Sequence, residues 1–209
     1  MSTAPQAAGS SETAASVLAF WFGDQPEHAA ASPERARLWW SKQAAVDAEM
    51  RARFGPLIAQ AGAGGLDGWD ATPEGRLALI LLCDQFTRNT ARGMPESFAL
   101  DPLARAWCLE GLQKNAFVGL LPIQRLFAYM PLEHSESLDH QDRCVLLMQG
   151  LRDEAGPTER ATFEGFVDYA EKHREIVRRF GRFPHRNAIL GRASTPEELA
   201  FLQTPGSSF

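Results

Sequence analysis

The chain has 209 residues, the length of one domain or two small ones, and it is long enough to bury a full hydrophobic core without disulfides or metal ions. Its net charge of −5 disfavours nucleic-acid binding, because a nucleic-acid-binding face must be basic. A hydrophobic content of 44% with 22% charged residues is that of a soluble globular protein and excludes wholesale disorder.

The sequence does not predict a membrane or secretory protein. The longest apolar run, residues 77–83, is far shorter than the ~20 residues of a membrane-spanning helix. The N-terminal segment lacks the basic and apolar parts of a signal peptide, and residues 1–13 are expected to form a flexible tail. Cys83, Cys108 and Cys144 lie in apolar helical contexts without a CxxC spacing, so we expect buried free thiols in a reducing cytoplasm.

From residue 14 onward the chain is expected to be helical. Four pairs mark helix starts, each with a capping residue before proline at the first helical position: Ser32-Pro33, Thr72-Pro73, Asp101-Pro102 and Thr195-Pro196. The apolar residues that follow recur with a helical period, and no segment alternates as a strand does. In chain order, helices are expected near residues 14–22, 33–60, 73–89, 102–115, 122–130, 135–151, 158–180 and 196–202. A break is expected near Gly55-Pro56 and a short helical turn near residues 187–190.

These elements predict a single all-α domain over residues 14–209. About eight to nine helices joined by short loops must pack as antiparallel helical hairpins. The sequence has no clean internal period of about 34 residues, so it does not by itself support a regular repeat array.

The first polar cluster continues a buried helical stripe. Asp84 extends the apolar stripe of residues 77–83, and Arg88 follows it by one helical turn; Gln85 and Asn89 are spaced in the same way. Charged groups on a buried stripe must be paired or line a cavity, because an isolated buried charge is too costly. The cluster is therefore either a pocket wall or a helix-end salt bridge between Asp84 and Arg88.

The second polar cluster consists of Glu133, His134 and Glu136. Pro131 is expected to interrupt the preceding helix, so that the next helix begins at about Ser135 and the cluster lies at its free backbone N–H groups. A histidine flanked by carboxylates can act as a general base with a fixed tautomer. The spacings match no metal-binding motif, and no metal is expected. The alternative is that Ser135 and the glutamates cap the helix.

The third polar cluster lies on a tight turn after the long helix. Its polar side chains are Arg182, His185, Arg186 and Asn187. Gly181 is expected to close the helix in a left-handed conformation, and Pro184 prevents its continuation. Two guanidinium groups, an imidazole and an amide this close together suit an anion such as a carboxylate or phosphate. His173 lies inside the apolar stripe of the long helix, where it is either a core histidine or a ligand-binding one.

Five segments carry a resemblance to a known family. They are VLAFWFGD (17–24), LWWSK (38–42), LALILLCDQFTRNTARG (77–93), RLFAYMPLEHSESLDHQ (125–141) and HREIVRRFGRFPHRNAILGRASTPEELAFL (173–202). With these segments the chain resembles the bacterial and plant family called domain of unknown function 924. The resemblance implies an all-α fold related to tetratricopeptide-like helical superhelices, and it implies no reaction.

The chain departs from the family pattern at one place. The family usually has proline where this chain has Thr87, and a bulky apolar or aromatic residue near Thr90-Ala91. The loop entering the expected pocket is therefore expected to be looser or lined differently. The charged and amide residues of the segment still match, Arg92 among them.

Two functions of different class follow. In the first, the three clusters form a cleft for a small anionic metabolite, and His134 acts in acid–base catalysis with Glu133 or Glu136. The ligand-binding residues would be Asp84, Gln85, Arg88, Asn89, Arg92, Tyr129, His173, Arg182, His185, Arg186 and Asn187. In the second, the protein is a helical scaffold whose concave face receives an acidic peptide, and the clusters are structural clasps. Neither function requires a cofactor.

Overall fold

The computed structural model describes residues 12–207, and within this range the chain is all-helical, as predicted. The α-helices are α1 (Ala14–Phe22), α2 (Pro33–Trp40), α3 (Ala44–Gly62), α4 (Pro73–Leu81), α5 (Thr87–Thr90), α6 (Asp101–Gln113), α7 (Pro122–Glu133), α8 (Leu138–Glu154), α9 (Arg160–Phe180) and α10 (Pro196–Leu202). Short 3₁₀ segments are η1 (Pro26–Ala31), η2 (Trp69–Ala71), η4 (Pro95–Phe98) and η5 (Pro184–Arg186), and η3 (Leu82–Phe86) is a π-helical segment that joins α4 to α5. Counting α4, η3 and α5 as one helix, the described residues contain nine α-helices.

Capping side chains begin several helices where the sequence predicts them. The hydroxyls of Ser32, Thr72 and Thr195 each accept a hydrogen bond from a backbone N–H three residues later. Gly181 closes α9 with a φ of 69°, the expected left-handed conformation. Residues 1–11 of the expected tail lie outside the described residues, and Thr13 caps α1.

Three predicted boundaries are wrong, two of them because a proline lies inside a helix. Pro56 is exposed within α3, so the carbonyl that it leaves without a donor can bond to water; the break lies instead between α2 and α3, at residues 41–43. Pro131 lies inside α7, which continues to Glu133 because proline already has a helical φ and costs one hydrogen bond near the helix end. The next helix begins at Leu138 and not at Ser135.

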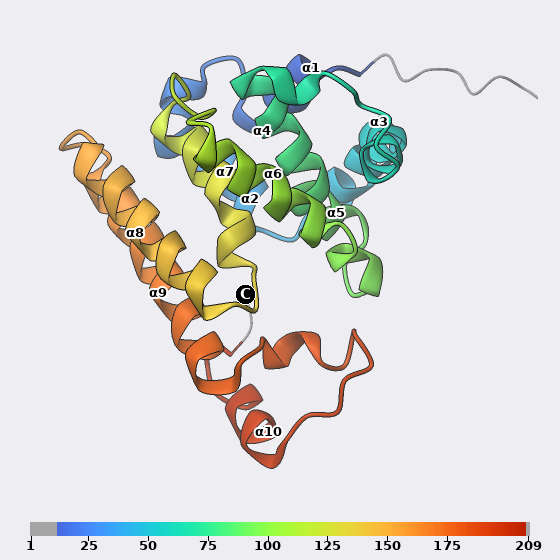
Figure 1. Ribbon diagram of the computed structural model, residues 1–209, viewed down its shortest axis with the longest axis vertical. Coiled ribbons are helices and arrows are strands. Elements are labelled where there is room, and N and C mark those ends of the chain that lie inside the picture. Colours follow the sequence, from blue (N-terminus) through green and yellow to red (C-terminus); the bar gives the residue numbers. More distant parts are fainter. Residues whose placement is uncertain (1–11, 208–209) are drawn as a thin grey trace, which may run out of the picture.

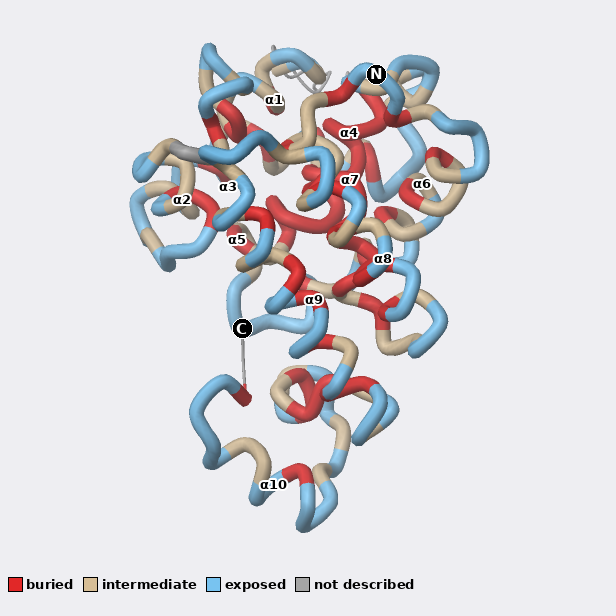
Figure 2. The backbone as a smooth tube through the Cα atoms, turned by 90° about the vertical axis from the view of Figure 1, so that its left-hand side faces the viewer, coloured by how far each residue is buried: buried red, intermediate tan, exposed pale blue. Residues whose placement is uncertain are grey.

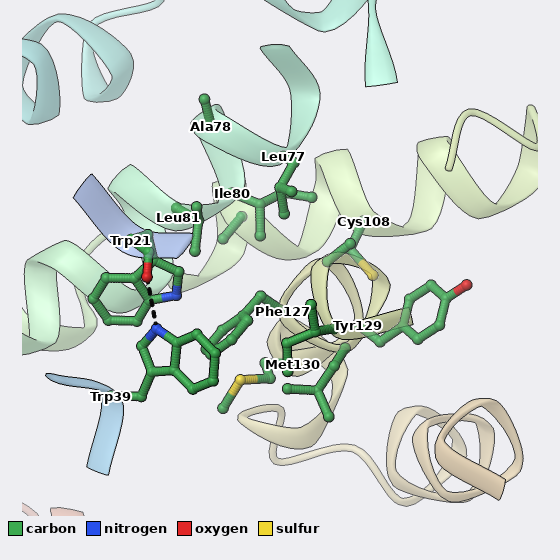
Figure 3. Packing of buried hydrophobic residues seen from close by; sticks show 14 of the residues in the cluster. Trp21, Trp39, Leu77, Ala78, Ile80, Leu81, Cys108, Phe127, Tyr129 and Met130 are labelled. Carbon is green, nitrogen blue, oxygen red and sulfur yellow. Dashed lines mark hydrogen bonds between the residues drawn. The ribbon is translucent and has the colours of Figure 1, made fainter. Parts of the chain in front are cut away.

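The core is centred on α4 and α7 and is rich in aromatic side chains. Trp21, Trp39 and Phe127 pack together there, and Trp39 Nε1 donates to the Trp21 carbonyl at 3.0 Å (Figure 3). Adjacent helical positions point about 100° apart, so Trp39 is buried while its neighbour Trp40 is 49% exposed. Figure 2 shows the buried backbone concentrated in these central helices.

The C-terminal third of the chain extends away from this core. Helices α8 and α9 form an antiparallel hairpin, and after α9 the chain turns back beneath α5 before it reaches α10 (Figure 1). Ile176, Val177 and Phe183 form a second, small apolar cluster in this region. No helix within the described residues is long and apolar enough to cross a membrane.

Candidate functional site

One continuous helix, built from α4, η3 and α5, supplies Asp84 and Arg88. The turn in η3 holds one residue more than an α-helical turn, which leaves carbonyl groups to be satisfied by side chains. The Thr87 hydroxyl donates to the carbonyls of Cys83 and Asp84, at 2.7 and 3.2 Å. Arg88 Nη1 also donates to the Asp84 carbonyl, at 2.6 Å. These bonds fix the wide turn and present the Asp84 carboxylate to the end of α7.

Asp84 and His134 form a buried hydrogen-bonded pair. Oδ1 of Asp84 lies 2.7 Å from Nδ1 of His134, and the same oxygen lies 3.0 Å from Nη1 of Arg88. Burial alone would raise the pKa of Asp84, but the charge of Arg88 and the interaction with His134, which includes a hydrogen bond, outweigh it and hold that pKa below its usual range. Burial, assisted by Arg88, lowers the pKa of His134 despite Asp84. The carboxylate can only accept, so Nδ1 of the neutral imidazole carries the proton and the other ring nitrogen has the lone pair.

Asp101 links Arg88 to Arg186, a role that its position before a proline in the sequence does not indicate. Its Oδ1 and Oδ2 lie 2.9 Å from Nη1 and Nη2 of Arg88, and Oδ2 lies 3.5 Å from Nη1 of Arg186. Because proline follows Asp101, the sequence predicts that Asp101 caps a helix. The structure has Leu100 at the cap position, with no side-chain cap.

The Arg186 guanidinium is buried against two phenyl rings. Its Cζ lies 4.5 Å from the ring centroid of Phe183 and 4.8 Å from that of Phe98, and the side chain is 8% exposed. Within residues 12–207, the guanidinium donates no hydrogen bond, and its Nε is fully buried. Burial and the charge of Arg88 lower the pKa of Arg186 to about 10. The Arg186 cation therefore lies in apolar surroundings, and its ion pair with Asp101 is long, at 3.5 Å.

Glu133 and His173 form a second buried carboxyl–imidazole pair. Nδ1 of His173 donates to the Tyr169 carbonyl at 2.9 Å and lies 3.5 Å from Oε1 of Glu133. Burial and the charge of Asp84 raise the pKa of Glu133 to about 8. Burial is also the main reason that the pKa of His173 falls to about 3. Both groups are therefore neutral at neutral pH.

Ring contacts connect these pairs into one group. The imidazoles of His134 and His173 have centroids 6.3 Å apart, His173 lies 5.6 Å from Phe183, and Phe183 lies 5.6 Å from His185. Burial, with the charge of Arg186, lowers the pKa of His185 to about 4. We use the name central cluster for eight residues: Asp84, Arg88, Asp101, Glu133, His134, His173, His185 and Arg186.

Other residues from the predicted site tie the C-terminal segment together. Glu136 accepts two hydrogen bonds from Arg192, at 2.7 and 2.9 Å, and one from the Phe183 backbone N–H at 2.8 Å. Arg182 pairs with Glu198 at 2.6 Å. Asn187 donates to Ser194 and Glu198 and accepts from Arg192. Glu136, Arg182 and Asn187 therefore have structural partners. Gly191 is the sequence feature that could have predicted the position of Arg192. A glycine favours a tight turn, and here its φ of 65° turns the chain back just before Arg192.

The remaining predicted residues have partners of their own. Arg92 pairs with Asp47 at 2.6 Å, and the Asn89 amide lies 3.3 Å from the Met50 sulfur. The Tyr129 ring packs against Phe117. Gln85 stays beside the cluster, donating to Oδ2 of Asp84 at 2.6 Å.

In the part of the chain that is described, no group of three His, Cys, Asp or Glu side chains is arranged to hold a metal ion.

Fold and cluster together define an all-helical protein with a buried ionic site between its central helices and its C-terminal segment. The chain belongs to a family described as a bacterial protein of unknown function (DUF924), whose model matches residues 17–206. It is similar to a solved structure, the protein of unknown function ATU0120 from Agrobacterium tumefaciens. The two are 38% identical over 91% of this chain and 96% of that one, with a TM-score of 0.77. No functionally curated protein matches the chain.

Proposed function

We propose that the central cluster binds a small anionic metabolite and that His134 acts there as a general base. The observation that carries this proposal is the Arg186 guanidinium, which is buried yet donates no hydrogen bond to any described residue. Within residues 12–207 its one ion-pair partner is Asp101, whose carboxylate already lies 2.9 Å from both terminal nitrogens of Arg88.

A buried donor without an acceptor costs about 1–3 kcal/mol, and a charged donor costs more. An incoming carboxylate or phosphate oxygen would supply the missing acceptor for Arg186. The guanidinium carbon of Arg186 lies over the rings of Phe98 and Phe183, and the N–H groups of a guanidinium point outward in its plane, so a ligand oxygen would meet its edge.

The chemistry open to His134 follows from its bond to Asp84. The carboxylate holds the proton on Nδ1 and orients the ring, which leaves the lone pair of the other nitrogen for a proton on the ligand. The imidazole side chain is 12% exposed, whereas Asp84 is fully buried. A carboxylate behind a histidine at the edge of a buried site is the arrangement of a general base.

Thermal unfolding with a panel of small carboxylates and phosphates tests the proposal. The variants are Arg186→Met, which keeps the volume of the side chain, and Arg92→Met, a control that removes the same charge from an ion pair elsewhere. An anion at about 100 times its Kd should stabilise the wild type and the control by ~2.7 kcal/mol and Arg186→Met by far less. Equal stabilisation of all three proteins, or of none, would overturn the proposal.

A helical scaffold for an acidic peptide is the second candidate. It is favoured by two exposed side chains on the α8–α9 hairpin, Leu146 and Tyr169, which are 68% and 53% exposed. A peptide on this hairpin would slow hydrogen exchange over many residues of α8 and α9. A small anion would slow it only around the central cluster.

A further inference from the structure

The charges of the central cluster cancel. Arg88 and Arg186 provide two positive charges, and Asp84 and Asp101 provide two negative ones. Glu133, at the end of α7, lies beside His173; burial and the charge of Asp84 raise its pKa to about 8, and it is neutral at pH 7. Glu136 and Arg192, which adjoin the cluster, neutralise each other. An anion that entered this site would therefore bring an uncompensated negative charge.

The surroundings make such a charge costly. Asp84 has no exposed surface, and His173, Glu133 and Arg186 are between 4% and 6% exposed. A net charge at a site as buried as this one is strongly disfavoured unless a counter-charge accompanies it. The cluster contains three imidazoles, His134, His173 and His185, and each can supply that counter-charge by taking up a proton.

Geometry singles out His134 among the three. Its Nδ1 already lies 2.7 Å from Oδ1 of Asp84, so an imidazolium at this position would have a carboxylate on one side and the ligand on the other. His173 instead donates to a neutral backbone carbonyl and faces an uncharged Glu133. His185 lies beside Arg186, whose charge opposes protonation.

We infer that the central cluster takes up a small monocarboxylate together with one proton, and that His134 carries this proton. The inference rests on the anion binding of the proposed function; with a monocarboxylate bound, the protonated His134 is a proton donor, and it acts as a base only when a ligand delivers the proton itself. A planar carboxylate fits the in-plane N–H groups of Arg186 and needs one proton for neutrality. A phosphate of charge near −2 would need about two protons and is the poorer ligand.

Isothermal titration calorimetry with acetate tests the inference. Titrations at pH 7 in buffers of different ionisation enthalpy give the number of protons bound per acetate. We expect about one proton per acetate, and an affinity that falls about tenfold per pH unit as the pH rises above neutrality. His134→Gln should lose the proton uptake and bind acetate at least tenfold more weakly at pH 7. The control is His140→Gln, because His140 bonds to Ser135 outside the cluster.

A second measurement does not depend on a variant. NMR of protein with ¹⁵N-labelled histidine should show the His134 ring becoming an imidazolium when acetate is added. Acetate binding without proton uptake, or with the proton on another histidine, would overturn the inference and leave the proposed anion site intact. Tighter binding of inorganic phosphate than of acetate would overturn the monocarboxylate class. If neither anion binds, the proposed function fails as well.

Discussion

Nδ1 of His134 lies 2.7 Å from Oδ1 of Asp84, although the two residues are 50 positions apart in the sequence. This hydrogen bond ties the C-terminal end of α7 to the π-helical segment η3. It joins two of the three polar sequence clusters, and Asp84 is also the partner of Arg88.

Asp84→Asn should destabilise the protein by about 3–5 kcal/mol at pH 7, because it leaves buried positive charge on Arg88 only partly compensated. The pKa of Asp84 is lowered in the folded protein, so its contribution to stability is present above its unfolded pKa of 3.8 and is lost as the pH falls below that value. Urea unfolding of both proteins between pH 7 and pH 2.5 measures this. A gap in unfolding free energy that stays constant below pH 4 would contradict the prediction.

Arg186→Met should leave stability unchanged or raise it by about 1 kcal/mol. The variant keeps an apolar side chain against Phe98 and Phe183 and removes a cation whose pKa is lowered, while Asp101 keeps its hydrogen bond and ion pair with Arg88. The matched variant Arg88→Met removes an ion-pair partner from both Asp84 and Asp101, and it should lower the free energy of unfolding by about 3–5 kcal/mol. Chemical denaturation of the ligand-free proteins decides the matter, and equal losses in the two variants would refute the distinction between them.

The raised pKa of Glu133 predicts that the protein becomes less stable as the pH rises from about 4.5 to about 8. Its folded pKa of about 8 lies above the unfolded value of 4.5, so its stabilising contribution is complete below pH 4.5 and is lost as the pH rises through 8. Between pH 5 and pH 8.5, the unfolding free energy of the wild type should fall by ~1–3 kcal/mol more than that of Glu133→Gln. Glu154→Gln, at an exposed ion pair, is the control and should follow the wild type.

Glu136→Gln should loosen the C-terminal segment without unfolding the core. The carboxylate accepts from Arg192 and from the Phe183 backbone N–H, and losing these charge-assisted bonds costs about 1–3 kcal/mol. Hydrogen exchange at the Phe183 amide should accelerate by roughly tenfold or more, while amides of α4 keep their wild-type rates. Uniform acceleration over the whole chain would show that the segment does not open separately.

The three cysteines should be unreactive in the native protein. Cys83, Cys108 and Cys144 have no exposed surface, and burial raises the pKa of Cys83 and of Cys108 to about 12. A thiol reagent at pH 8 should label none of them on mixing and all of them in denaturant. Rapid labelling of one native cysteine would disprove its burial.

Local sequence rules predicted the elements of this fold well. Capping hydroxyls and helical periods gave α1 and α10 with their observed bounds, and Gly181 gave the end of α9. Pro56 and Pro131 misled the prediction, because sequence alone does not show that one proline faces solvent and the other lies near a helix end.

The same local rules predicted only part of the central cluster. Asp84, Arg88, His134 and Arg186 were singled out because polar residues interrupt apolar stripes or crowd one turn. Asp101 was not, because an aspartate before proline is equally typical of a helix cap, and its role depends on which helices meet in three dimensions. The partners of Glu136 and Arg182 likewise come from tertiary packing.

The π-helical segment η3 also constrains the length of its helix. Its wide turn contains one residue more than a regular α-turn, so an insertion of one residue can create such a turn and a deletion can remove it. Deleting one residue there would rotate Thr87–Thr90 by about 100° relative to α4 and would turn Arg88 away from Asp101. Between Thr72 and Thr90, then, we expect related chains with the same site to differ by substitutions but to share the same number of residues.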